Sequence, residues 1–234
     1  MPAIVDLPAL TSDVRALRSV GSSDRSLLVG LSGIDGSGKG FLAAALSREL
    51  EQSHLRVALL NADGWLNLPA IRFSPREPAE RFYRNALRLE EMFSTLVLPL
   101  RQHRTHRLLA RYAEETATAY RDHLYDFRDI DVVLVEGIFI YKRAHRACFD
   151  LAVWIDCSFE TALERALGRA QEGLPPAETI AVYETIYFPA QRLHCRRDEP
   201  RRRADAVVVN DPRLSAALEA PLRGIGSAGD RTSW

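Results

Sequence analysis

The 234-residue sequence has few cysteines and no long apolar segment, and each absence excludes a class of protein. Its cysteines, Cys148, Cys157 and Cys195, are odd in number and form no C-x-x-C pair, so we predict neither disulfides nor a zinc site. No apolar run approaches the roughly 20 residues that span a bilayer. Residues 1–7 lack the basic and apolar regions of a signal peptide. We therefore expect a cytoplasmic protein with reduced thiols and no membrane contact.

The sequence also lacks an excess of charge of either sign. Lys plus Arg and Asp plus Glu both total 31, so the formal net charge is zero. This balance argues against nucleic acid as a partner, although it allows a local basic pocket. The length favours one α/β domain with a short tail, and the sequence leaves open whether the chain forms a homo-oligomer.

The most informative segment is Gly33–Gly40, which matches the phosphate-loop pattern G-x-x-x-x-G-K-[ST] at every position except the last. Residues 26–32 before it form a short apolar run, which indicates a buried strand. Residues 41–50 after it have apolar side chains at helical spacing. A strand, a glycine-rich turn and a helix in this order are the context that a phosphate-binding loop requires.

The residue types of this loop suit the binding of nucleotide phosphates. Glycines let the backbone curve around an anion, the following helix presents unpaired N–H groups, and a lysine adds a mobile charge. The missing hydroxyl at the last position shifts the holding of Mg²⁺ to carboxylates or water. An ordinary glycine-rich turn is the alternative. The predicted nucleotide-binding residues are Gly33, Asp35, Gly36, Ser37, Gly38, Lys39 and Gly40.

The rest of the chain alternates between apolar strands and amphipathic helices. This order predicts a mainly parallel sheet covered by helices on both faces, which is a three-layer αβα fold. An antiparallel hairpin is expected within 105–127. Further strands are predicted at 56–61, 131–137, 151–156 and 204–210, and helices at 79–98, 159–173 and 176–194.

Two carboxylates follow predicted strands, and ligands of such folds bind at the carboxyl ends of strands. Asp63 comes just after the strand at 56–61, and Glu136 lies at the end of the strand at 131–137. We predict that Glu136, together with Asp63, holds Mg²⁺ or its waters. The alternatives are a strand-end residue paired with an arginine for Glu136 and a turn-forming residue for Asp63.

Four segments together resemble the uridine kinase-like group of P-loop kinases, which is related to phosphoribulokinase. They are Gly33–Gly40, Asn61–Asn67, Val133–Ile138, and Arg165–Arg169 followed by Tyr183 and Pro189. The resemblance covers about residues 27–211. It implies a P-loop fold with a helical lid, ATP or GTP and Mg²⁺ as cofactors, and a small-molecule acceptor. We expect an N-terminal helix and linker in 1–25, the kinase domain in 26–220 and a flexible tail in 221–234.

The resemblance also implies roles for single residues. Asp63 acts on the acceptor hydroxyl, because a carboxylate can orient a weak nucleophile and accept its proton. Lys39, Arg165 and Arg169 offset the charge of the phosphoryl group, and the two arginines share a helix face at i, i+4 spacing. The alternative for the arginines is pairing with Glu164 or Glu172 on a solvated face.

The resemblance places the acceptor against Trp65, Tyr83 and Tyr112, although a core role is equally open for the first two. The sequence departs from the group after Tyr112, where Ala113-Glu-Glu-Thr replaces the aromatic–histidine spacing. His123 is better explained as a structural residue. The acceptor is therefore expected to be a uridine-like nucleoside or a sugar-like compound. Another metabolite, or a regulatory module with little turnover, is the alternative.

Overall fold

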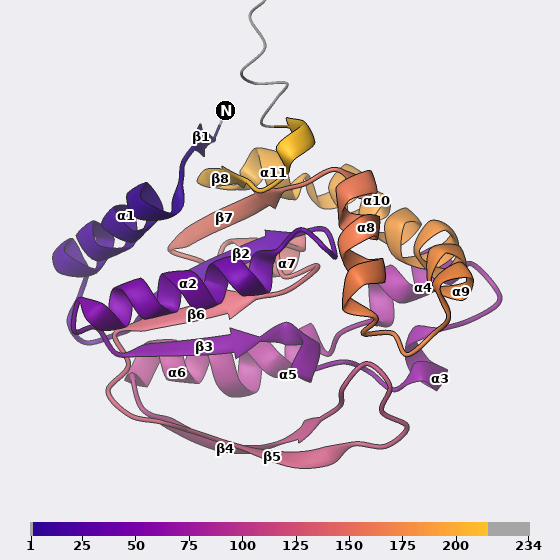
Figure 1. Cartoon of the computed structure of the whole chain (residues 1–234). Helices are drawn as coiled ribbons and strands as arrows, with labels where there is room; N and C mark the ends of the chain where they lie inside the picture. The colour runs from indigo at the N-terminus through magenta and orange to yellow at the C-terminus, as the bar shows by residue number, and fades with distance from the viewer. Residues whose placement is uncertain (1, 215–234) are drawn as a thin grey trace, which may run out of the picture.

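The computed structural model describes residues 2–214 and has a six-stranded parallel sheet in the order β1-β8-β7-β2-β6-β3 (Figure 1). This sheet confirms the predicted αβα fold. Its strands are β1 Ala3–Ile4, β2 Leu27–Gly33, β3 Val57–Asn61, β6 Val132–Glu136, β7 Leu151–Asp156 and β8 Ala206–Val209. β2 lies centrally, between β7 and β6, and its residues are all buried, as the apolar run predicts.

Helices cover both faces of the sheet. Figure 1 shows α1 (Leu7–Val20) and α2 (Lys39–Gln52) on the near face, with α5 (Leu89–Met92), α6 (Leu98–His103) and α7 (Arg143–Arg146) behind it. α1 and α2 bury leucines in one apolar cluster with β2, β6 and β7. A second cluster on the other side of the sheet contains most of the buried aromatic residues. This packing fixes the end of β2, from which the phosphate loop emerges.

The N-terminal segment joins the main sheet. The helix expected within 1–25 is present as α1, and β1 adds an edge strand, which we did not predict. Ala3 and Ile4 pair with Ala206 and Val207 of β8. A two-residue strand has too little pattern to be recognised from sequence. The tail expected at 221–234 lies outside the described residues.

The single helix predicted for 79–98 is wrong. The segment forms α4 (Pro78–Asn85), then α5, a π-helical stretch at Phe93–Val97, and α6. The chain leaves the helix at residues 86–88 because it pairs there with residues 65–67. Leu87 forms an antiparallel bridge with Leu66, and the Arg88 N–H donates to the Trp65 carbonyl oxygen at 2.9 Å. Helical periodicity continues through this break, so the pattern alone did not reveal it.

The predicted hairpin is confirmed as β4 (His106–Tyr112) paired with β5 (Arg121–Phe127). The lid region consists of α8 (Phe159–Arg169) and α9 (Pro176–Val182). A π-helical stretch at Tyr183–Tyr187 continues into α10 (Phe188–Asp198). α8 ends four residues before the predicted Gly173, because Ala170 adopts a left-handed conformation with φ 49°. The shorter helices are α3 (Pro69–Arg72), α11 (Pro200–Arg203) and a 3₁₀ turn at Ala62–Gly64.

Candidate active site

The phosphate loop has the backbone that its glycines predict. Gly36 and Gly38 have φ values of 77° and 85°, where a side chain is strained, and a Cβ on Gly36 would also collide with the Ala162 carbonyl. α2 begins directly after the loop, at Lys39. The N–H groups of its first turn therefore have no carbonyl four residues earlier within the helix and are available to an anion.

The loop is held from outside by three distant elements. The Asn210 side-chain amide, beyond β8, donates to the Ser37 carbonyl at 2.8 Å. Arg165 on α8 donates to the Ser37 carbonyl at 3.3 Å and to that of Gly36 at 3.4 Å. Gln191 on α10 accepts a hydrogen bond from the Asp35 N–H at 3.0 Å. These contacts fix the loop before any phosphate binds, which lowers the entropic cost of binding.

Asp35 gathers the cations of the site. Its carboxylate lies 3.9 Å from Lys39 Nζ and 3.3 Å from an Arg169 nitrogen, and it accepts a hydrogen bond from the Tyr183 hydroxyl. Enclosure raises the pKa of Asp35, but Lys39, Arg169 and Tyr183 outweigh this effect and hold the pKa below its ordinary value. The carboxylate therefore stays charged and keeps both cations beside the loop.

Glu136 is the last residue of β6 and lies in register with Leu31 of β2 and Asn61 of β3. The side chain is only 5% exposed. Burial raises its pKa to about 7, with Lys39 opposing the rise and the nearby carboxylates adding to it. A Cβ built on Gly40 would lie 3.6 Å from Glu136 Oε1, so the usual loop hydroxyl would stand beside this carboxylate.

The Glu136 carboxylate beside the phosphate loop fits an Mg²⁺ ion that binds together with nucleotide. Within residues 2–214, no three His, Cys, Asp or Glu side chains form a metal site of their own. Mg²⁺ commonly takes one or two carboxylates and completes its shell with phosphate oxygens and water. Glu136, buried beside the loop, offers hard oxygen ligands of this kind.

Asp63 lies in the 3₁₀ turn after β3, where its N–H donates to the Asn61 side-chain oxygen at 2.7 Å. Its side chain lines a cavity of about 190 Å³ that also reaches Asp35 and Arg169. Partial loss of hydration beside the cavity walls raises the pKa of Asp63, although the residue remains exposed to solvent. Lys39 opposes this rise, whereas the carboxylate of Asp35 adds to it. A carboxylate of raised proton affinity therefore faces the same cavity as Arg169 and Asp35.

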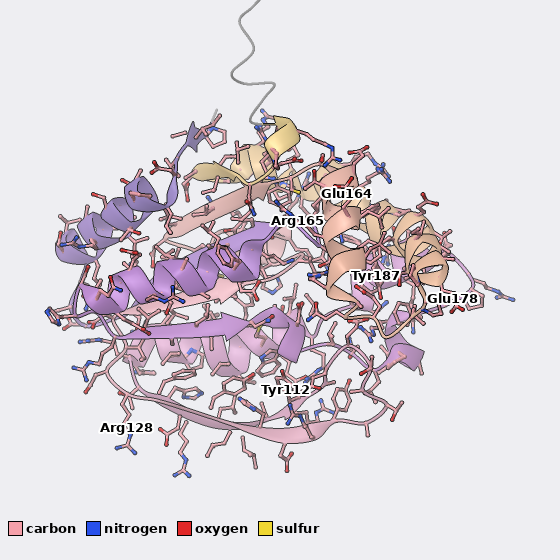
Figure 2. The ribbon with its side chains drawn as sticks, viewed as in Figure 1. Tyr112, Arg128, Glu164, Arg165, Glu178 and Tyr187 are labelled. Atoms are coloured by element: carbon pink, nitrogen blue, oxygen red, sulfur yellow. The ribbon has the colours of Figure 1, made fainter. Side chains whose placement is uncertain are left out.

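The predicted lid arginines point to different places. Arg169 lies at the cavity, whereas Arg165 contacts the loop carbonyls and reaches toward the start of α2 (Figure 2). Arg169 is also 3.9 Å from Glu172, so the weighed pairing with that residue is present. Glu164 pairs instead with Arg213, at 2.6 Å.

Of the three predicted acceptor-binding aromatic residues, only Tyr112 lines the cavity. Its ring lies against Gly64 and 5.1 Å from the ring of His123, which has a packing role (Figure 2). Trp65 is fully buried and stacks on Tyr125. Tyr83 is also buried, and its hydroxyl donates to Asp198 at 2.7 Å. The structure places Trp65 and Tyr83 in the core and not at the cavity.

Several residues of the site were not predicted. Phe82, Glu115, Glu172, Tyr187 and Gln191 line the cavity. Phe82, Tyr187 and Gln191 come from helical segments, Glu172 follows α8, and Glu115 lies in the loop between β4 and β5. A second hollow of about 420 Å³ lies on the other side of the loop, between Phe41, Arg165 and Asn210. Phe41 is 82% exposed there. In the sequence, the one signal for this hollow was Phe41, an aromatic residue directly after the lysine and glycine of the loop.

No family model matches the chain, and no curated protein matches it significantly. Solved structures do. The possible uridine kinase from Bacillus stearothermophilus has 20% identity and a TM-score of 0.65, over 86% of this chain and 99% of its own. A candidate fructose transport system kinase from Silicibacter sp. TM1040 has 19% identity and a TM-score of 0.66, over 87% and 98%. D-glycerate 3-kinase from Cryptococcus neoformans has 14% identity and a TM-score of 0.55, over 80% and 87%.

The chain therefore has the fold of P-loop kinases, as the resemblance of the four segments predicts. The names of these neighbours refer to different compounds, namely uridine, fructose transport and glycerate. At this identity, the likeness defines the fold and leaves the acceptor open. None of the helices within residues 2–214 has the length and apolarity needed to cross a membrane.

Proposed function

We propose that the protein is a small-molecule kinase that transfers the γ-phosphate of ATP or GTP to a hydroxyl group of a small acceptor. One observation carries the proposal. Asp35 of the phosphate loop, the lid arginine Arg169 and the strand-end carboxylate Asp63 line one cavity, and Lys39 lies 3.9 Å from Asp35. Phosphoryl transfer needs positioning and charge stabilisation in this arrangement, with a base beside the acceptor. We place this activity in the cytoplasm.

The nucleotide phosphates bind on residues 33–40, and the base occupies the hollow beside Phe41 and Arg165. The ring of Phe41 can stack on one face of the base, and the guanidinium group of Arg165 can lie against the other face. Glu136, with Asp63 nearby, holds Mg²⁺, which neutralises charge on the β- and γ-phosphates when it is bound. Arg165 also keeps the loop carbonyls in place.

Asp63 accepts the proton of the acceptor hydroxyl as the oxygen attacks the γ-phosphorus. Its raised pKa favours this role, because a base works best when its proton affinity is near the working pH. Lys39 and Arg169 offset the charge of the phosphoryl group in transfer. In the absence of nucleotide, Asp35 keeps these two cations at the site.

A nucleotide-binding regulatory module with little turnover is the second candidate, and Gly40 is the observation that favours it. The lost hydroxyl removes a usual Mg²⁺ ligand. The position of Asp63 argues for turnover, because a protein that only binds nucleotide has little use for a carboxylate facing an acceptor cavity.

The test is Lys39→Ala, with Arg48→Ala on the exposed face of the same helix as the matched control. We expect Lys39→Ala to lower acceptor-dependent ADP release at least tenfold, or about 1.4 kcal/mol of barrier. It should also weaken the binding of a fluorescent ATP analogue. Arg48→Ala should match the unsubstituted enzyme in both measurements. Unchanged turnover by folded Lys39→Ala protein would refute the proposed function.

A further inference from the structure

The cavity beside the phosphate loop is lined by many more carboxylates than cations. Its one lining cation among the described residues is Arg169, and its carboxylates are Asp35, Asp63, Glu114, Glu115 and Glu172. Glu114 and Glu115 are neutralised from outside by Arg121 and Arg72, which do not line the cavity. Asp35 likewise lies 3.9 Å from Lys39, which does not line the cavity, so the excess of negative charge that faces the cavity comes mainly from Asp63 and Glu172.

Arg169 is not free for an acceptor. One of its nitrogens lies 3.3 Å from Asp35, 3.2 Å from the Tyr183 hydroxyl and 3.9 Å from Glu172. In the proposed reaction, this guanidinium group turns to the transferring phosphate. An acceptor that carried a carboxylate or a phosphate would then meet the remaining carboxylates of the cavity without a cation of its own.

Two residues that line the cavity each carry a buried polar atom with no hydrogen-bond partner within residues 2–214. One is Nε2 of Gln191, whose side chain is 2% exposed and whose oxygen is already bonded to the Asp35 N–H. The other is Oε2 of Glu172, whose side chain is 7% exposed. Buried polar groups of native proteins rarely lack partners. An amide N–H₂ needs an oxygen acceptor, and a carboxylate oxygen needs an O–H or N–H donor.

The size and walls of the cavity narrow the acceptor further. At about 190 Å³, it has the volume of roughly six liquid waters, and ligand pockets for drug-sized compounds usually start near 300 Å³. Phe82 and Tyr187, whose ring centroids are 4.7 Å apart, form an apolar wall, and Tyr112 contributes a third ring. Such walls suit the C–H face of a single sugar ring or a polyol chain.

From this charge, these unpartnered atoms and this volume, we infer that the acceptor is a compact polyol without negative charge, of about the size of a monosaccharide. One of its hydroxyl groups donates to Glu172, another accepts from Gln191, and a third faces Asp63. This inference rests on the proposed kinase function. It excludes carboxylated acceptors such as glycerate, the compound for which one of the similar structures is named.

The first experiment measures ADP release by the full chain with ATP and Mg²⁺ over a matched panel of acceptors. The panel contains neutral hexoses and sugar alcohols, the corresponding amino sugars, aldonic acids and sugar phosphates, and uridine. We expect kcat/KM for the best neutral or aminated monosaccharide to exceed that of every acid, phosphate and nucleoside at least a hundredfold. The inference is overturned if an anion or uridine is phosphorylated as well as the best sugar, or if no panel member is phosphorylated.

The second experiment uses Gln191→Glu, which keeps the oxygen that binds the Asp35 N–H and replaces the donor with a negative charge. Its KM for the best sugar should rise at least tenfold, while the KM for ATP changes less than twofold. Glu172→Gln should lower, at least tenfold, the ratio of kcat/KM for the best neutral sugar to kcat/KM for the carboxylated acceptors. The matched control is Glu178→Gln, an exposed carboxylate on the outer end of α9, which should change neither value (Figure 2).

The two proposals fail in different ways. If the protein does not bind an ATP analogue, or turns over ATP equally in Lys39→Ala, the kinase function itself is wrong. If nucleotide binds and is used, but Gln191→Glu and Glu172→Gln leave the acceptor preference unchanged, only the inference about the acceptor is wrong.

Discussion

Gly40 is the residue at which the site departs from other phosphate loops, and its surroundings show what the departure changes. A Cβ at this position would make ordinary van der Waals contact with the Glu136 carboxylate, at 3.6 to 3.9 Å. The loop can therefore accept a side chain without strain. A hydroxyl there would stand beside Glu136, so in the proposed site the glycine would leave Mg²⁺ with one protein ligand fewer.

We predict that Gly40→Ser lowers the Mg²⁺ concentration needed for the half-maximal rate by several-fold, because it adds a metal ligand. Magnesium titration of ADP release at saturating ATP and acceptor measures this value. Ala44→Ser, at an exposed position of α2, is the control. An unchanged or raised Mg²⁺ requirement in Gly40→Ser would place the metal elsewhere.

At this scale, a local motif suggested Lys39, Asp63 and Glu136 as site residues, whereas residues brought in by long-range packing had no such signal. Glu136 ends β6, Asp63 lies two residues after β3, and Lys39 follows β2 across the phosphate loop, so the fold carries all three to one edge of the sheet. Gln191 reaches the loop across 156 residues of sequence, and no local pattern encodes that contact. Trp65 follows the same strand as Asp63, but its ring turns into the core, and residue type alone does not set that direction.

At the scale of elements, the lid is closed over the loop by the residues around Asp35. Tyr183, in the π-helical stretch after α9, contacts both Asp35 and Glu172, and Arg169 at the end of α8 contacts all three. The end of α8 and the stretch after α9 therefore both contact the carboxylate of Asp35 in the phosphate loop. This network joins the end of α8 and the stretch after α9 to the phosphate loop, and in the proposed reaction the phosphates would compete with it for Arg169.

We predict that Tyr183→Phe loosens the lid without unfolding the domain. Loss of a hydrogen bond worth about 1 kcal/mol should raise the amide hydrogen-exchange rate of residues 165–187 roughly fivefold in the nucleotide-free protein. Exchange measured by mass spectrometry tests this change. Thr185→Ala, in the same stretch, removes an exposed hydroxyl that bonds only within the helix, and should have little effect on exchange. Equal exchange in both variants would contradict a lid held through Tyr183.

The elements themselves were largely predictable, because apolar strands and amphipathic helices keep their periods. The helix break at residues 86–88 was not, since it depends on pairing with residues 65–67, about 20 positions away. The π-helical stretches at Phe93–Val97 and Tyr183–Tyr187 were missed for a related reason. They preserve a helical pattern, and their extra residue per turn has no recognisable signature in one sequence.

At the scale of the whole molecule, the end of the sheet opposite the site is held by ionic contacts. Asp150, at the start of β7, accepts hydrogen bonds from the Leu28 N–H of β2, from Arg25 and from Arg101. Burial raises the pKa of Asp150, but Arg25, Leu28 and Arg101 outweigh it and hold the pKa below its ordinary value. Because the folded state favours the charged form, Asp150 stabilises the fold above the ordinary pKa of Asp, and this contribution is lost as the pH falls further.

We predict that Asp150→Asn lowers the free energy of unfolding by about 2 kcal/mol at pH 7, since it weakens several hydrogen bonds to a charged group. Urea unfolding over a pH series should also show a smaller loss of stability in acid for this variant than for the unsubstituted protein. Asp129→Asn is the control. Asp129 pairs with Arg56 on the surface, and its loss should cost less than about 1 kcal/mol. An equal acid dependence in the two variants would refute the role of Asp150.

The measurement that tests the central claim most directly is transfer of labelled γ-phosphate from ATP to the best acceptor by Asp63→Asn. This change keeps the shape of the side chain and removes its charge and its proton affinity. If Asp63 is the base, kcat should fall by roughly 10²–10⁴-fold, with little change in the KM for ATP and no recovery in excess Mg²⁺. Recovery in excess Mg²⁺ would make Asp63 a metal ligand instead, and a kcat near that of the unsubstituted enzyme would contradict its catalytic role.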